Sequence, residues 1–211
     1  MKTLNARIIA AIALLLGSLS LAAAQSAGGE AFVRESADEV IDILTTASGR
    51  EEREQRFTSM LNERADLRRI GRFALGAEGR RVSKTDFETY QELLETLIIK
   101  VYANRLGDYS DEQIIIKGSQ QKKRNVIVET EITFTSGREP ISLDWWLIEQ
   151  KNGGYKLFDI RVLGVWMAQE QRDTFTSVLK NNKGDFNALL GHLRRQVKEG
   201  LEENAKAQTS G

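Results

Sequence analysis

A change of hydrophobic period along the chain constrains its fold more than any other feature of the sequence. Between residues 85 and 106, apolar side chains recur at spacings of three and four, as on one face of a helix. Between residues 113 and 163, apolar and polar side chains alternate, which is typical of strands with one buried face. Helical spacing then returns to the end of the chain. Helices, a sheet and further helices predict one α+β domain.

The alternating region divides into four strands at its turn signals. They are expected at 114–116, 125–135, 141–150 and 155–163. Asn152-Gly153-Gly154 is a hairpin signal between the last two. Because the connections are short, the prediction is a four-stranded antiparallel sheet with helices around it.

Helices are expected on both sides of the sheet in the sequence. Their predicted ranges are 31–44, 51–62, 66–75, 85–106, 169–179 and 185–197. Gly76 follows the third, where a left-handed residue ends a helix. Thr85 and Glu88 have the spacing of a capping box at the start of the fourth.

The N-terminal segment has the pattern of a secretory signal. Lys2 and Arg7 precede an apolar run over residues 8–21, and Ala22-Ala23-Ala24 supplies small residues for cleavage. The run is shorter than the roughly 20 apolar residues of a membrane-spanning helix. We therefore expect a signal peptide at 1–24, a lipid-binding domain at 25–198 and a flexible C-terminal tail at 199–211.

Charge and composition exclude several classes of function. Without residues 1–24 the chain has 28 basic and 30 acidic residues, a net charge of −2. This balance gives no general attraction to nucleic acid. There is no Cys and a single His, His192, which excludes the usual zinc sites and leaves one possible centre for a Ser-His-Asp triad. We predict no metal, no cofactor and no enzymatic activity.

Two strand carboxylates, Asp144 and Asp159, are the alternative to that prediction. Alternation places each opposite apolar neighbours, on the polar face of its strand. A surface carboxylate is the simpler interpretation of both. A general base in a cone-shaped pocket remains the enzymatic alternative, with the chemistry of a small hydrolase or isomerase.

Three stretches in fixed order resemble the MlaC, or toluene-tolerance, family over residues 31–197. The first is 71–76 followed by Phe87, Tyr90 and Leu94; the second is 101–106 leading to Tyr109-Ser110; the third is 155–160 followed by Gly164-Val165, Gln171-Arg172 and Phe175. Asp144-Trp145 and Trp166-Met167-Ala168 also resemble the branch found beside hopanoid-synthesis genes. Leu163 and Trp166 depart from the family's usual Glu and Ser.

The resemblance implies a fold similar to nuclear transport factor 2, with a curved sheet wrapped by helices. It implies a monomeric periplasmic carrier of phospholipid, or of a hopanoid-like lipid. It also implies two partners: an inner-membrane ABC lipid transporter and an outer-membrane lipoprotein–porin complex. A periplasmic adaptor or chaperone is the alternative without a ligand.

The predicted ligand site lies between the helix 85–106 and the concave face of the sheet. Its lining residues are expected to be Leu94, Ile98, Val101, Val128, Ile132, Trp145 and Leu147. If Val101 and Val128 line a cavity, Trp at either position should displace lipid at little cost in stability.

Overall fold

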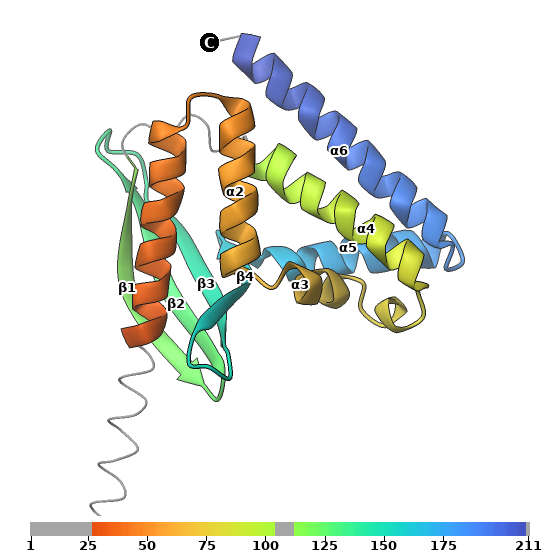
Figure 1. The fold of residues 1–211 in the computed structure, drawn as a ribbon, viewed down its shortest axis with the longest axis horizontal. Helices are drawn as coiled ribbons and strands as arrows, with labels where there is room; N and C mark the ends of the chain where they lie inside the picture. The colour runs from red at the N-terminus through yellow and green to blue at the C-terminus, as the bar shows by residue number, and fades with distance from the viewer. Residues whose placement is uncertain (1–26, 104–111, 210–211) are drawn as a thin grey trace, which may run out of the picture.

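The computed structural model describes residues 27–103 and 112–209 (Figure 1). The predicted signal peptide and residues 104–106, the end of one predicted helix, lie outside the described residues. The helices are 27–46, α2 (Arg50–Arg64), α3 (Leu67–Ala74), α4 (Lys84–Thr96), α5 (Met167–Asn181) and α6 (Phe186–Thr209), with a 3₁₀ turn at Glu78–Arg80 and a π-helix at Leu97–Ala103. The strands are β1 (Glu112–Lys122), β2 (Asn125–Phe134), β3 (Ile141–Glu149), β4 (Tyr155–Val162) and β5 (Val165–Trp166).

The strands form one antiparallel sheet in the order β1-β2-β3-β4-β5. The α+β class is confirmed, but the predicted number of four strands is wrong. β5 has two residues, too few for an alternating pattern, and pairs with Arg161 and Val162 of β4. Leu163 and Gly164 make the turn before it with φ of 49° and 86°. Leucine is uncommon in this left-handed region, which favours glycine.

Helix α4 begins and ends differently from the prediction. Its N-cap is Ser83, whose Oγ accepts a hydrogen bond from the Asp86 amide at 3.1 Å. The predicted Thr85–Glu88 capping box is therefore wrong, although the spacing of three residues is right. After Thr96 the helix widens into the π-helix Leu97–Ala103.

The long helix α6 supports that π-helix. Asn204 Nδ2 donates hydrogen bonds to the carbonyl oxygens of Lys100 and Val101 at 3.1 and 3.2 Å. Gly200 faces the same turn so closely that a Cβ there would lie 2.4 Å from Val101 Cγ1. Residues 199–209 are thus helical, whereas the sequence predicts a flexible tail from residue 199. The polar and small side chains of this segment do not predict a helix, and the contacts of Gly200 and Asn204 with the π-helix hold it in place.

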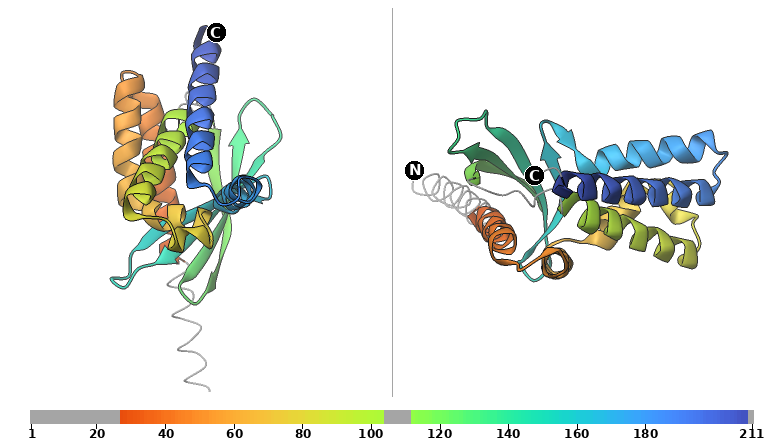
Figure 2. Two further views of the ribbon diagram at one scale, coloured as in Figure 1. Left: turned by 90° about the vertical axis from the view of Figure 1, so that its right-hand side faces the viewer. Right: turned by 90° about the horizontal axis from the view of Figure 1, so that it is seen from above.

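Apolar side chains gather in three clusters. The helical cluster joins α3–α6, the π-helix and Ala74-Leu75, and includes Tyr90, Phe175 and Leu193. The sheet cluster joins the sheet to the helix 27–46 through Val33. The hairpin cluster holds the helix 27–46 against α2. Figure 2 shows the helix 27–46 and α2 on one side of the sheet, and α3–α6 on the other.

None of the helices within the described ranges is long and apolar enough to cross a membrane.

Candidate functional site

The inner face of the sheet, which packs against the helix 27–46, carries two rows of apolar side chains. Ile114, Ile132 and Ile141 are paired across β1, β2 and β3 in one row. The neighbouring row runs Ile116, Thr130, Leu143 and Val162. We call the six apolar members the apolar platform: Ile114, Ile116, Ile132, Ile141, Leu143 and Val162. All six are half-buried.

The same face is fully covered at its other end. Val126, Val128 and Leu147 are each 0% exposed. The helix 27–46 reaches them closely, since a Cβ on Gly29 would lie 2.8 Å from Val126 Cγ1. The later part of that helix turns its apolar residue Ile43 toward α2 instead. The platform is therefore a part of the inner face that is less completely covered than Val126, Val128 and Leu147.

Polar groups beside the six platform residues form hydrogen bonds with one another. Thr130 is 1% exposed, and its Oγ1 donates to the carbonyl oxygen of Leu143. The indole N–H of Trp145 donates to the same Oγ1 at 3.2 Å. Because these groups are satisfied, the surface offers hydrocarbon and few directional bonds. It suits a ligand that is mainly apolar.

The predicted lining residues fall into two separate groups. Val128, Trp145 and Leu147 are buried in the sheet cluster, and Ile132 lies beside them on the platform. The helix residues Leu94, Ile98 and Val101 belong to the helical cluster instead. The structure does not bring the two groups together in one cluster. That any of the seven contacts lipid stays a prediction.

The expected tolerance of Trp at Val101 or Val128 does not fit their packing. Val101 is 2% exposed and contacts Gly200 of α6, while Val128 is fully buried. Added volume at filled positions typically costs 1–3 kcal/mol. The five platform residues that sequence reasoning missed are Ile114, Ile116, Ile141, Leu143 and Val162. Their alternation was the available signal, but alternation cannot tell which part of a face a helix covers.

The two strand carboxylates are buried, which corrects their predicted place on an exposed polar face. Asp144 is 3% exposed and pairs with Arg161, whose Nε lies 2.5 Å from Asp144 Oδ2. Asp159 is 5% exposed, and its Oδ1 accepts from the amides of Ile160 and Ala168, both at 2.8 Å. Burial raises the pKa of Asp159, against the lowering effect of these amides. Helices α3 and α5 cover this face of the sheet, the outer face, which is opposite the helix 27–46. Both carboxylates therefore form their bonds within the fold.

His192 lies on α6 beside Phe175, with ring centroids 6.5 Å apart. Burial lowers its pKa, and Arg195 lowers it further. The described residues contain no group of three or more His, Asp or Glu placed to hold a metal ion.

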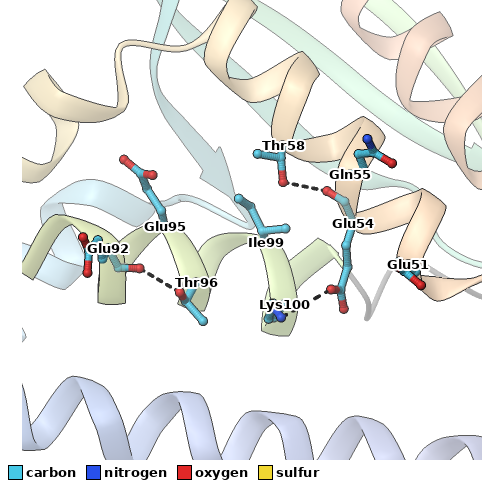
Figure 3. Close-up of a pocket in the computed structure, with 9 residues that line it drawn as sticks. All are labelled: Glu51, Glu54, Gln55, Thr58, Glu92, Glu95, Thr96, Ile99 and Lys100. Carbon is cyan, nitrogen blue, oxygen red and sulfur yellow. Dashed lines mark hydrogen bonds and ion pairs between the residues drawn. The ribbon is translucent and has the colours of Figure 1, made fainter. Parts of the chain in front are cut away.

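A polar cleft of about 390 Å³ separates α2 from α4 and the π-helix (Figure 3). Its nine lining residues include four glutamates, Glu51, Glu54, Glu92 and Glu95, with Lys100 placed 3.7 Å from Glu54. Ile99 is the one aliphatic side chain among the nine. Such a lining is unsuited to an acyl chain, unlike the apolar platform.

Comparisons with known proteins show the family and the fold of the chain. The family described as MlaC protein matches residues 34–195, more than half of the chain. No curated protein matches. Among solved structures, a phospholipid-binding protein from Ralstonia solanacearum, determined in complex with a phospholipid, superposes with a TM-score of 0.73. Its sequence is 21% identical, over 81% of this chain and 97% of that chain, so the likeness shows the fold. The family match identifies the chain as a member of the MlaC family.

Proposed function

We propose that this protein binds the acyl part of a phospholipid, or of a related lipid such as a hopanoid, against the apolar platform. The observation that carries the proposal is the fold it shares with a protein solved in complex with a phospholipid. The platform supports it, because six half-buried aliphatic side chains form two rows with internally satisfied polar groups.

Burial of acyl chains supplies the binding energy. Each methylene removed from water contributes roughly 0.8 kcal/mol, so part of one chain outweighs any single hydrogen bond at this surface. The chemistry needs no general base, and both strand carboxylates bond within the fold. A binding role without catalysis therefore fits the site better than a hydrolase or isomerase.

The wider role in the proposal is that of a periplasmic shuttle. After cleavage behind Ala24, the carrier would take lipid between an outer-membrane lipoprotein–porin complex and an inner-membrane ABC transporter. These partners, the periplasmic location and a likeness to nuclear transport factor 2 follow from the family resemblance. A soluble carrier is physically required for such transfer, since lipid in water loses its apolar surroundings.

Native mass spectrometry of the protein purified from a Gram-negative periplasm tests both the lipid binding and the periplasmic location. The expected protein mass begins at Gln25, with an adduct of lipid size. Ile132→Asp should lower lipid per protein about tenfold or more, because it places a carboxylate against the chain. Ile115→Asp is the matched control: it lies on the neighbouring strand but on the opposite face, 44% exposed. Equal lipid in both variants would contradict the platform as the site.

A further inference from the structure

Arginines stack on aromatic rings along the outer side of the molecule, where α3 meets α4, α5 and β4. Arg68 and Arg72 lie over the ring of Phe87, at 4.9 and 4.2 Å from its centroid. Arg69 lies 5.7 Å from Phe158, and Arg172 of α5 lies 5.0 Å from Phe73. The rings of Phe73 and Phe158 meet edge to face, with their centroids 5.1 Å apart. We call these four arginines the arginine surface.

The arginine surface carries positive charge that is not held in ion pairs. In the part of the chain that the structure describes, no carboxylate forms an ion pair with any of the four guanidinium groups. Asp66, the acid next to α3, is engaged as its N-cap and accepts from the Arg69 amide. Arg161, further along, is neutralised by Asp144. Arg72 Nη1 donates a long hydrogen bond of 3.5 Å to the carbonyl oxygen of Gly79. A guanidinium stacked on a ring can still present N–H groups at its edge, and these match phosphate oxygens.

An exposed apolar turn joins β4 to β5, and Leu163 at this turn is 71% exposed. Trp166 follows, and its ring contacts Trp146 at 5.7 Å, which in turn contacts Phe158 at 4.9 Å. Leu163 follows the end of β4 and is five residues after Phe158, roughly 16 Å at strand spacing. Aromatic contacts thus connect the apolar turn to the arginine surface.

We propose that this side of the protein docks on the surface of an anionic phospholipid bilayer. The four arginines lie at the lipid phosphates, and Leu163 at the tip of the turn enters the interface beside Trp166. Charge complementarity selects an anionic partner. The exposed apolar turn with its neighbouring Trp favours a bilayer over an acidic protein, because such side chains settle at the boundary of headgroups and hydrocarbon. The arginine surface is separate from the ligand site, since Arg69 stacks on Phe158 at the outer face of the sheet and the platform lies on the inner face.

Flotation with large unilamellar vesicles at low salt tests the proposal. Wild type should bind vesicles of phosphatidylcholine with about one quarter phosphatidylglycerol, and should not bind phosphatidylcholine alone. Each basic residue near an anionic surface contributes about 1 kcal/mol, or roughly fivefold in partitioning. Arg69→Gln with Arg172→Gln should therefore weaken binding about 25-fold. The matched control, Arg194→Gln with Arg195→Gln on exposed positions of α6, should change it less than about twofold.

The proposal would be overturned by absence of wild-type binding to the anionic vesicles, by equal losses in the two double variants, or by wild-type binding to poly-glutamate in place of vesicles. The last would make the surface a docking site for an acidic protein. Arg69→Lys with Arg172→Lys keeps the charge and should stay within about threefold of wild type; a loss as large as that of the Gln variant would also contradict charge-driven docking. Lipid per protein should be unchanged in every variant, which separates this test from that of the ligand site.

Discussion

Asp159 shows how one residue can look catalytic in sequence and prove structural. Its Oδ1 accepts hydrogen bonds from the Ile160 amide beside it on β4 and from the Ala168 amide in the first turn of α5, while its Oδ2 is buried without a hydrogen-bond partner. The first oxygen acts as a helix cap, and the second accounts for the raised pKa, since a buried charge is poorly solvated.

Substitutions at Asp159 should separate these two effects. Asp159→Ala should cost about 1 kcal/mol, the usual value of a lost N-cap, or about 2–4 °C in Tm for a protein of this size. Asp159→Asn keeps the accepting oxygen and removes the charge, so it should cost less than half as much. Thermal melts at neutral pH check this order. An Asn variant as unstable as the Ala variant would show that the charge, not the cap, matters.

The pH dependence of stability gives a second comparison, between wild type and Asp159→Asn. Because the folded-state pKa of Asp159 is raised, the folded protein holds this proton more tightly than the unfolded chain does. Its contribution to stability is present below the ordinary pKa of about 3.9 and is lost as pH rises through the folded pKa. The Tm of wild type minus that of Asp159→Asn should therefore increase as pH is lowered from 7 toward 4. A constant difference would contradict the raised pKa.

At the scale of elements, the contact between α6 and the π-helix is the least expected feature. The side-chain amide of Asn204 donates to the carbonyl oxygens of both Lys100 and Val101. Asn204→Ala removes these two hydrogen bonds and should cost about 1–3 kcal/mol, measured by chemical denaturation. Glu202→Ala is the control on the same helix, because its exposed pair with Lys198 is worth less than about 0.5 kcal/mol. Equal effects of the two substitutions would show that the contact contributes nothing.

The sequence predicts elements with a clear period better than it predicts their ends or their mutual packing. Helix α4 and strands β2 and β3 follow from spacing alone, because one face of each is buried. The two-residue β5 and the π-helix have no periodic signal of their own. The candidate site could be predicted only in part. Alternation identifies Ile132 as an inner-face residue. It does not show that a helix from about 100 positions earlier in the sequence covers Val128 and leaves Ile132 half-buried.

At the scale of the whole molecule, the described residues form three apolar clusters in place of the single core that is usual in a domain of this size. The platform borders the sheet cluster, so bound lipid would extend that cluster and leave the helical cluster as it is. Binding only to the folded state raises stability by about 2.7 kcal/mol at a free ligand concentration 100-fold above Kd.

Hydrogen exchange before and after loading with phosphatidylglycerol should show where this stabilisation falls. Amides of β2 and β3 beside Ile132 and Ile141 should gain protection. Amides of α6 around Leu189, in the helical cluster, should change little beyond the global effect. Protection that rises only in the helical cluster would place the ligand there, with Leu94, Ile98 and Val101.

The order of the strands also bears on how the chain reaches this structure. Every strand pairs with its neighbour in the sequence, so the sheet can form hairpin by hairpin with short loops to close. The helix 27–46 is different: Glu30 and Ser119, which share a hydrogen bond of 2.6 Å, are 89 residues apart. Closing such a long loop is entropically costly before its contacts form. The docking of the first helix should therefore be the late step in folding, and substitutions at Val33 should speed unfolding more than they slow refolding.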